Sequence, residues 1–587
     1  MPLFTRPRPR PDRDPVPVPA PAAEAVPEEL VRGATDGQGG GVPGVPRRPL
    51  GRRVAGMVGT ASAVAFVLLG LLLPDRLAGL TPGAFLRLPG EAVLGAALLL
   101  VLTGRARDLV AGALGLVLGV TVLLGALDLG FHEALGRPFD PVLDWILLDD
   151  GQAFLRDSVG RTGALLATAA ALALALAVPA AGMASVVRLG RSLRRSGAVA
   201  APVTLAGGTV WVVCAALGAQ FAGAPLAARS TADALADRVR QTRATFADEE
   251  VFEKAAADDA FRDTPGDRLL RGLRGKDVLF VFVESYGRAA LEDPAMAPHL
   301  GVLLADSTER LKAAGYASRS GFLTSPTTGA GSWLAHSTFL SGLWVAHQQR
   351  YRSVTASDRL TLTEAFRRTG AWRTVGIMPG VTREWPEGRF YGLDRVYDSR
   401  ELGYRGPKFS WAPVPDQFSL AAFERLEGGR AGRGPLMAGI VLVSSHNPWA
   451  PIPEMLDWDG LGDGSVYEGV RARGADPRRV WRDPERVRTE YRRSVEYSLT
   501  SLVSYLEEYG DEDTVLVFLG DHQPIPAVAG EGASRDVPVA MVAKDPAVFD
   551  RIGHWGWDEG LAPSPSAPVW RMDTFRDRFL GAFGPAS

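Results

Sequence analysis

The chain has 587 residues, of which 46% are hydrophobic and 22% charged, and its formal net charge is -2. This length exceeds one ordinary domain, and the apolar character of the first third excludes a wholly soluble protein. The near-neutral charge and the dispersed arginines give no electrostatic basis for binding nucleic acid, which we set aside as a partner.

The first fifty residues are rich in Pro, Arg and Gly and contain hardly any aromatic side chains. A segment of this composition cannot bury enough apolar surface to offset its chain entropy. We therefore predict that residues 1–50 form a disordered tail, and the membrane topology described next places that tail in the cytoplasm.

Residues 51–225 are predicted to cross the membrane five times. Each of five apolar stretches is close to the roughly 20 residues that span a hydrocarbon core. They cover about 54–74, 84–103, 109–127, 162–186 and 201–222. Arginines gather before the first stretch, between the second and third, and between the fourth and fifth, and such basic segments stay in the cytoplasm. An odd number of spans then places everything after about residue 225 on the outer side of the plasma membrane.

The exported part is predicted to begin with a helical connector, residues 226–275, and to continue as an α/β domain, residues 276–587. The only cysteine, Cys214, lies in the fifth apolar stretch, so this domain is expected to have no disulfide. Short apolar runs alternate here with helical patterns, which is typical of a mostly parallel sheet covered by helices on both faces. The expected strands are Val278–Val283, Arg373–Met378, Ile440–Val443, Val515–Leu519 and Val537–Val542.

Metal-ligand side chains follow two of these strands directly. Asp521 and His522 come after the run that ends at Gly520, and Glu284 comes after the run that ends at Val283. Open α/β sheets bind ligands at the carboxyl ends of their strands. Two carboxylates and an imidazole suit a hard or borderline divalent cation, so we predict one ion, with Mn preferred and Zn or Mg as alternatives.

A segment rich in glycine and hydroxyl residues, 327–342, lies between the two ligand strands and contains a candidate nucleophile, Ser332. Glycines let the backbone approach a ligand closely, and a hydroxyl at a helix start lies in the positive end of the helix dipole. Coordination to a divalent cation would activate the hydroxyl without a dedicated base. The alternative is that Ser332 caps the helix, and Thr327 and Thr328 are weaker rival nucleophiles.

These motifs resemble the alkaline phosphatase superfamily, and within it the membrane-anchored lipoteichoic acid synthase and phosphoethanolamine transferase group. The resemblance covers roughly residues 54–545 and implies five amino-terminal spans followed by an exported sulfatase-like α/β/α domain. It also implies that the metal ligands are Glu284, Ser332, Asp521 and His522, with Ser332 as the catalytic nucleophile.

The sequence departs from the sulfatase pattern beside the nucleophile. Sulfatases have Pro two residues and Arg four residues after the residue that becomes formylglycine, whereas this chain has Leu334 and His336. An unmodified hydroxyl is therefore expected, which favours phosphoryl transfer over hydrolysis of sulfate esters. The lipoteichoic acid synthase group uses Thr as nucleophile, so Ser332 is a conservative departure.

Three further residues resemble the substrate-binding positions of the group. His446, in Ser444–Trp449, matches a Ser-His-x-Pro segment, while Arg383 and Trp385 match a segment that contributes to the head-group pocket. A guanidinium suits phosphate oxygens because it binds them in a fork. The alternatives are that His446 is an ordinary loop residue and that Trp385 only packs. Three other histidines are interpreted as structural rather than as ligands: His299, His336 and His347.

The resemblance implies a metal-dependent phosphotransferase that moves a phosphoglycerol- or phosphoethanolamine-type head group from a membrane phospholipid to a glycolipid or cell-envelope polymer. An extracytoplasmic phosphodiesterase or sulfatase-type hydrolase of the same fold is the main alternative. A membrane scaffold that keeps the fold without catalysis is a third, which the complete set of candidate ligands argues against.

Overall fold

The computed structural model describes residues 50–74, 76–135, 137–141, 143–221, 224–228, 230–382, 385–409 and 411–585. The chain falls into two units, Met1–Met57 and Val58–Ser587. The predicted disordered tail lies outside the described residues except for its last position, where helix α1 (Leu50–Leu72) begins.

Four helices in the described part of the chain are long and apolar enough to cross a membrane: Val54–Leu72 in α1, Gly104–Glu133 in α3 (Gly104–Leu135), Gly160–Arg195 in α4 (Trp145–Arg195), and α5 (Gly197–Leu217). The second predicted span, 84–103, contains only the twelve-residue helix α2 (Gly90–Val101). That helix is about 18 Å long, against about 30 Å of hydrocarbon. It begins late because Leu88 and Pro89 form strand β1, which pairs with β4 (Ala227–Ala228). Five spanning helices are therefore not confirmed.

Helices α3 and α4 approach each other too closely for side chains at their crossing. A Cβ atom on Gly115 would lie 2.5 Å from the carbonyl oxygen of Gly182, and one on Gly119 would lie 2.5 Å from the Cα of Pro179. Small residues four apart are typical of helix pairs in membranes, where close backbone approach replaces the hydrophobic effect as the source of attraction.

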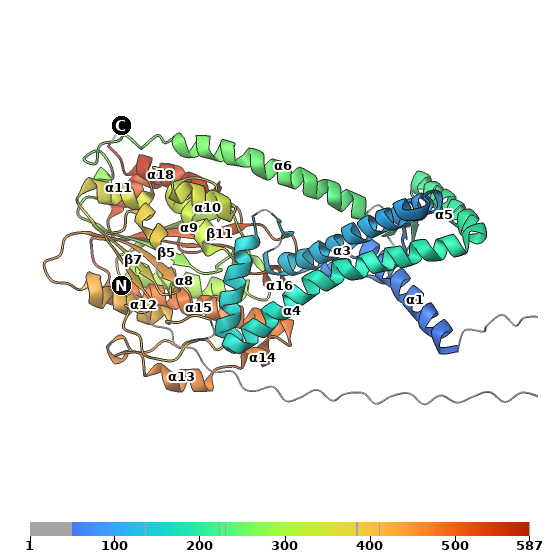
Figure 1. Ribbon diagram of the computed structural model, residues 1–587. Coiled ribbons are helices and arrows are strands. Elements are labelled where there is room, and N and C mark those ends of the chain that lie inside the picture. The colour runs from blue at the N-terminus through green and yellow to red at the C-terminus, as the bar shows by residue number, and fades with distance from the viewer. Residues whose placement is uncertain are drawn as a thin grey trace, which may run out of the picture. The chain divides into compact units, whose positions relative to one another are not determined.

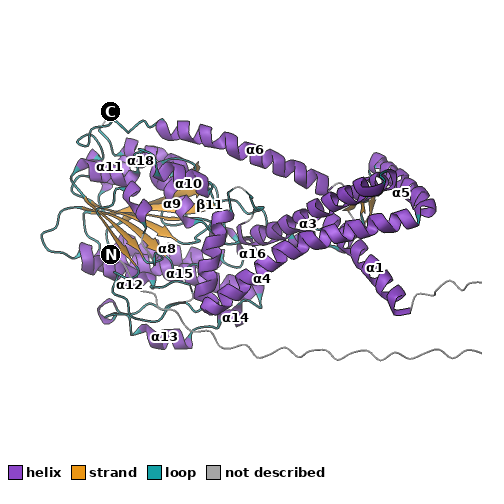
Figure 2. Ribbon diagram, in the orientation of Figure 1, coloured by secondary structure: helices purple, strands orange, loops and turns teal. Residues whose placement is uncertain are grey.

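The α/β part is built on a mixed, mostly parallel sheet, whose strands are orange in Figure 2. The strand order is β12-β6-β11-β10-β5-β9-β7-β8, with β13 beside β6. Its strands are β5 (Asp277–Val283), β6 (Ala317–Thr324), β7 (Arg373–Met378), β8 (Arg395–Asp398), β9 (Leu436–Leu442), β10 (Thr514–Gly520), β11 (Asp536–Ala543), β12 (Asp558–Glu559) and β13 (Val569–Arg571). Strands β2 (Gln220–Phe221) and β3 (Ala224–Pro225) form a separate pair.

The five predicted strands all exist and correspond to β5, β7, β9, β10 and β11. The run β10-β5-β9-β7-β8 is parallel throughout. Strand β11 instead runs antiparallel to both β10 and β6, so the parallel run ends at β10. Beyond β11, strand β13 is again parallel to β6, while β12 is antiparallel to it. The sequence analysis missed β6, whose run Ala317–Thr324 mixes small and polar residues and has no apolar alternation.

Helices cover both faces of the sheet (Figure 1). On one face lie α8 (Ala297–Ala313), α12 (Asp416–Phe423) and α15 (Pro484–Tyr509), and on the other lie α9 (Ser332–Ser341), α11 (Leu362–Thr369) and α18 (Phe575–Ala582). Strand β5 contributes to both cores because its side chains alternate: Leu279 and Val281 pack with the first group, Phe280 and Phe282 with the second.

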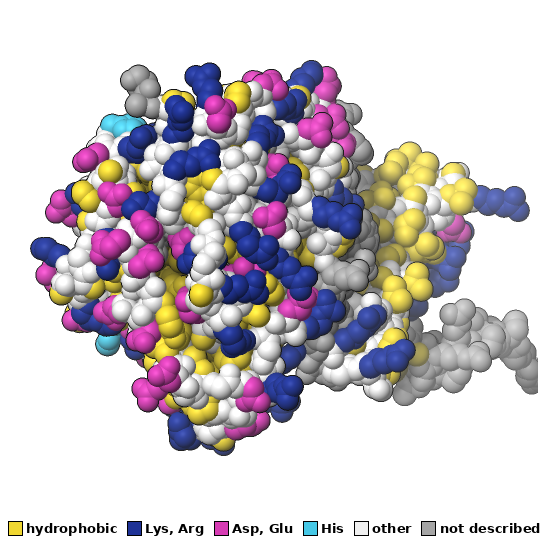
Figure 3. All heavy atoms as spheres, turned by 90° about the vertical axis from the view of Figure 1, so that its left-hand side faces the viewer, with side chains coloured by type: hydrophobic (Ala, Val, Ile, Leu, Met, Phe, Trp, Pro, Cys, Tyr) yellow, Lys and Arg dark blue, Asp and Glu magenta, His cyan; other side chains and the backbone are white. Residues whose placement is uncertain are grey.

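The shorter helices of the α/β part are α7 (Ala289–Glu292), α10 (Gln348–Thr355), α13 (Tyr467–Arg473), α14 (Pro477–Val480), α16 (Pro526–Ala529) and α17 (Pro546–Ile552). Acidic and basic side chains are interspersed over the face that Figure 3 shows.

The predicted connector contains one long helix, α6 (Ser230–Ala257), whose carboxyl end is fixed to the α/β part. The Arg359 guanidinium donates to the carbonyl oxygens of Ala255 and Asp258, which a helix end leaves without partners. Just beyond, Asp259 forms an ion pair with Arg576 at 2.9 Å, and both side chains are completely buried. Breaking such a pair leaves an uncompensated buried charge, so α6 is held firmly at this end.

The loop after β9 is held in shape by Asp416, a buried residue at the start of α12. One carboxylate oxygen accepts the backbone N–H groups of Val443 (2.7 Å) and Ser444 (2.9 Å), and the other accepts the Ser498 hydroxyl (2.5 Å). Burial raises the pKa of Asp416 to about 6, although these hydrogen bonds oppose the shift. The loop that carries His446 therefore depends on a carboxyl group that titrates in mildly acidic solution.

We predict that Asp416 lowers the stability of the protein as the pH rises from about 4 to about 6. The folded chain holds the carboxyl proton of Asp416 more tightly than the unfolded chain, where the pKa is 3.8. The stabilisation by the protonated carboxyl group is therefore complete at low pH and is lost as the pH rises through the folded pKa. The difference between the folded pKa of about 6 and the unfolded pKa of 3.8 corresponds to about 3 kcal/mol in the free energy of unfolding. Asp416→Asn cannot titrate, so its melting temperature in detergent should depend less on pH over this interval. Parallel curves of melting temperature against pH for the variant and the wild type would contradict the prediction. The control is Glu508→Gln at an exposed position, which should follow the wild-type curve.

Candidate active site

The parallel pairing of β5 with β10 brings the predicted metal ligands together. Val283 lies opposite Gly520, so the residues that follow each strand, Glu284 on one and Asp521 and His522 on the other, emerge at the same sheet edge. One ligand atom from each of these three side chains lies within 4.8 Å of the other two, and all three residues are buried. Glycine is needed at 520, since a Cβ there would meet the Tyr286 carbonyl oxygen at 1.8 Å.

Ser332, the first residue of α9, lies beside two members of this group, Glu284 and His522. Its hydroxyl donates to Glu284 Oε2 at 2.9 Å, and its Oγ is 3.2 Å from His522 Nε2. The helix cap is Gly331, whose φ of 84° favours glycine, and Ser332 makes no capping bond. The hydroxyl of the rival Thr327 donates to the Ala330 carbonyl within the turn. The structure therefore brings together the four residues that the sequence singled out.

Backbone groups orient two of the ligands. Asp521 Oδ1 accepts the N–H groups of Ser285 and His522, each at 2.8 Å. His522 Nδ1 lies 2.8 Å from the Gln523 carbonyl oxygen, and since a carbonyl can only accept, Nδ1 carries a proton. In the neutral ring Nε2 then presents its lone pair toward Glu284 and Ser332. A ligating histidine is commonly oriented in this way by a carbonyl on its other nitrogen.

The charges of the site are strongly coupled. Burial by itself would raise the pKa of Glu284, but the charge of His522 and its hydrogen bond outweigh burial and hold that pKa below its ordinary value. Burial opposes protonation of His522, yet Asp521 and Glu284 together raise its pKa to about 9. Two buried carboxylates thus attract positive charge, which a proton on His522 supplies when no other cation does.

The donor set fits a divalent cation. Among the described residues, Asp521 Oδ2 has no hydrogen-bond partner although it is completely buried. Leaving a buried acceptor without a partner costs about 1–3 kcal/mol, more when it is charged, and a coordinated cation removes that cost. Two carboxylates, an imidazole nitrogen and a hydroxyl are ligands that Mn, Zn and Mg all accept.

The three residues predicted to bind substrate differ in where they lie in the structure. His446 stacks on Trp411 with ring centroids 4.0 Å apart, and it is near enough to Glu284 to influence the pKa of that carboxyl group. Trp385 stacks on Tyr391 at 5.4 Å, and its Nε1 donates to the Tyr351 hydroxyl at 3.3 Å, which is a packing role as much as a binding one. Arg383 lies outside the described residues.

Two residues near the site escaped the sequence analysis. Trp411 supports the His446 ring, but no motif marks a lone Trp in a loop. His336, interpreted as structural from the sequence, has its Nε2 only 3.6 Å from Asp521 Oδ2. The contacts of His347 are structural. Its Nε2 lies 3.1 Å from Asp248 Oδ2 on α6, and its side chain caps the amino-terminal end of α10.

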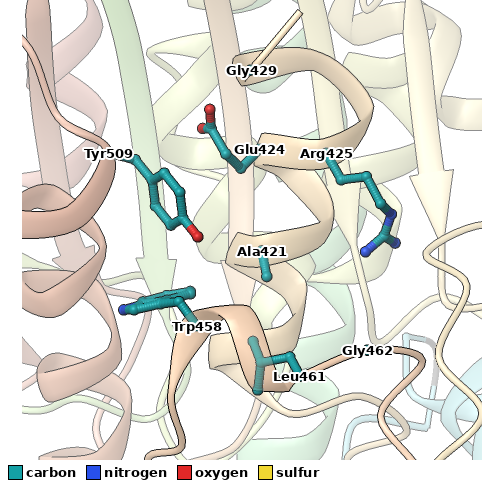
Figure 4. A pocket seen from close by; sticks show the side chains of 8 residues that line it. All are labelled: Ala421, Glu424, Arg425, Gly429, Trp458, Leu461, Gly462 and Tyr509. Carbon is teal, nitrogen blue, oxygen red and sulfur yellow. The ribbon is translucent and has the colours of Figure 1, made fainter.

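A cavity of about 310 Å³ lies elsewhere in the domain (Figure 4). It is lined by Ala421, Glu424, Arg425, Gly429, Trp458, Leu461, Gly462 and Tyr509. None of the residues that the sequence proposed for chemistry is among them, so the candidate active site is defined by its side chains rather than by this cavity.

No family model and no curated protein matches the chain. Solved structures that match include proteins of the group that the motifs resemble and also a 2-O GAG sulfatase, BT1596 (12% identity, 53% of this chain and 71% of that chain, TM-score 0.32). They include the lipoteichoic acid synthase LtaP from Listeria monocytogenes (16% identity, 54% of this chain and 76% of that chain, TM-score 0.36). The phosphoglycerol transferase GacH from Streptococcus pyogenes, in complex with sn-glycerol-1-phosphate, also matches (10% identity, 57% of this chain and 91% of that chain, TM-score 0.32). So does the periplasmic domain of phosphoethanolamine transferase EptC from Campylobacter jejuni (13% identity, 52% of this chain and 89% of that chain, TM-score 0.31). TM-scores this low carry little weight, so a functional assignment has to rest on the geometry of the site.

Proposed function

We propose that the protein is a membrane-anchored, metal-dependent phosphotransferase that moves a phosphoglycerol- or phosphoethanolamine-type head group from a phospholipid to a cell-envelope acceptor. The observation that carries this proposal is the position of the Ser332 hydroxyl, which bonds to Glu284 and lies beside His522 within a buried set of cation ligands. A serine that only capped a helix would bond to the backbone of its own first turn.

The proposed reaction has two displacements at phosphorus. A divalent cation held by Glu284, Ser332, Asp521 and His522 would acidify the serine hydroxyl and offset negative charge on the phosphoryl oxygens. Ser332 Oγ attacks the phosphodiester in line, the bond to diacylglycerol breaks, and the head group stays on Ser332 as a phosphodiester. An acceptor hydroxyl from a glycolipid or growing polymer then attacks the same phosphorus and releases Ser332. Among the three ions that fit, we favour Mn.

Other residues of this chain are proposed to hold the phosphoryl group. His446, oriented by Trp411, would donate to a phosphoryl oxygen, and Arg383 would bind the phosphate in a fork, with Trp385 shaping the head-group pocket. Anchoring fits this chemistry, because a site fixed to the membrane meets lipid substrates at a high effective concentration. In this proposal residues 51–225 are the anchor, 226–275 the connector and 276–587 the catalytic domain.

We further propose that the chain crosses the membrane five times and that the catalytic domain is extracytoplasmic. The pairing of β1, which follows α1, with β4, which follows α5, supports this proposal, because two paired strands are expected on the same side of a membrane. An even number of crossings must then separate them, which requires α2 to cross with α3, α4 and α5. Helix α2 packs against both α4 and α5. Basic segments at the α2–α3 and α4–α5 junctions then share the cytoplasmic side.

A covalent intermediate on Ser332 is the direct prediction of this mechanism. Full-length protein incubated with phosphatidylglycerol or phosphatidylethanolamine should gain the mass of one head group, located on the Ser332 peptide by mass spectrometry. Ser332→Ala should abolish the adduct and lower the transfer rate by at least about 10³-fold, whereas Ser332→Thr should keep the adduct. Thr327→Ala is the matched control. An adduct on Thr327 would show that Thr327, and not Ser332, is the nucleophile. Release of free head group at the same rate with or without acceptor would favour the hydrolase.

The metal requirement gives a second prediction. Protein purified without chelator should contain one equivalent of a divalent metal, and Asp521→Asn should weaken its affinity at least about 100-fold, because a carboxylate ligand is lost together with a charge. Metal content after dialysis measures this directly. Asp513→Asn, an exposed acid at the opposite end of the same strand, should keep its metal. Full metal occupancy in Asp521→Asn would disprove the ligand set.

The topology can be tested by labelling intact cells with a membrane-impermeant maleimide. In a Cys214→Ser background, a cysteine at exposed Thr103, between α2 and α3, should be protected, and one at exposed Ser566, in the α/β part, should be labelled. If α2 did not cross, the chain would have four spans and both results would be reversed. Permeabilised cells, in which both positions should react, provide the control.

A further inference from the structure

Two buried polar atoms without partners face each other next to the candidate metal centre. His336 Nε2 and Asp521 Oδ2 are 3.6 Å apart, and neither makes a hydrogen bond with any described residue. His336 is on α9, four residues after Ser332, so both side chains lie on the same face of that helix. The helix that presents the nucleophile therefore also presents an imidazole to one of the proposed ligands.

The remaining contacts of Asp521 show why Oδ2 is the important oxygen. Oδ1 already accepts two backbone N–H groups, from Ser285 and His522, which use its lone pairs. Oδ2 is left for a cation, and it has room for a second partner because a carboxylate oxygen carries two lone pairs. His336 is the side chain next to it.

The His336 ring is held in this position by packing. It lies against Phe282, with ring centroids 4.2 Å apart, and only 18% of its side chain is exposed. Phe282 is on β5, two residues before Glu284, so one strand carries both a metal ligand and the support for His336. The gap of 3.6 Å exceeds a normal hydrogen bond by about 0.5 Å, which a small side-chain rotation closes.

We propose that His336 is a positioning residue for the metal centre: its Nε2–H donates to Asp521 Oδ2 and fixes the carboxylate for coordination. This rests on the metal-dependent function proposed above. His336 is not itself a ligand of that ion, because it does not belong to the group whose ligand atoms lie within 4.8 Å of one another. Hydrogen bonds to ligating groups strengthen metal binding by about 10- to 100-fold, because they remove the freedom of the ligand to turn away.

Two substitutions separate the hydrogen bond from the shape of the side chain. His336→Phe keeps a ring against Phe282 but has no donor, and His336→Gln places an amide N–H near the position of Nε2. Full-length protein in detergent is freed of metal and titrated with Mn²⁺, and binding is followed by electron paramagnetic resonance. We expect the Mn²⁺ dissociation constant to rise about 10- to 100-fold in the Phe variant and to return to within about threefold of wild type in the Gln variant. The spectrum of bound Mn²⁺ should change in the Phe variant and be restored in the Gln variant.

The controls distinguish this proposal from the function on which it rests. His299→Gln, at an exposed histidine on α8, should bind Mn²⁺ as wild type does, and equal melting temperatures of the metal-free proteins show that the variants fold. If wild type binds Mn²⁺ and the Phe variant binds it equally well, the role of His336 is refuted while the metal centre stands. If wild type binds no divalent metal, both proposals fail. Two Mn²⁺ equivalents in wild type and one in the Phe variant would show that His336 is a ligand of a second ion, which also overturns the proposal.

Discussion

The chemistry of this protein depends on one pairing in its sheet, the parallel register of β5 with β10. Because Val283 lies opposite Gly520, the two chains leave the sheet at the same level and deliver Glu284, Asp521 and His522 to a single point. Parallel strands buried on both faces hold such a register firmly, since a shift by one residue would turn every apolar side chain to the opposite core. The site is therefore positioned by two strands at the buried centre of the sheet.

That pairing also concentrates negative charge where water is excluded. Asp521 is completely buried and Glu284 nearly so, and the neighbouring His522 holds the pKa of Glu284 below its ordinary value, which favours the carboxylate form. Buried charges persist only when they are paired, hydrogen-bonded or bound to a metal. Backbone N–H groups and the Ser285 hydroxyl satisfy part of this requirement. A divalent cation bound by these side chains would satisfy the rest, and this is the physical basis of the metal-dependent function proposed above.

The proposed nucleophile, Ser332, lies on a separate element, so its position has a separate cause. Helix α9 packs on the face of the sheet that carries Phe280 and Phe282, through Ala335 and Phe339. This packing directs the amino-terminal end of α9 at the ends of β5 and β10, where Ser332 reaches Glu284. The same orientation brings His336, one helical turn later, to Asp521. The position of one helix thus determines where both Ser332 and His336 lie.

The sequence by itself determined the apolar segments, the strands that become β5, β7, β9, β10 and β11, and the candidate ligands that follow two of them. It could do so because buried strands and membrane helices are marked by local composition. Only the tertiary structure decided that α2 is short, that β11 runs antiparallel, that Ser332 bonds to Glu284 instead of capping its helix, and that His336 faces Asp521. These features depend on contacts between residues far apart in the chain, and no local pattern of amino acids records the distance between them.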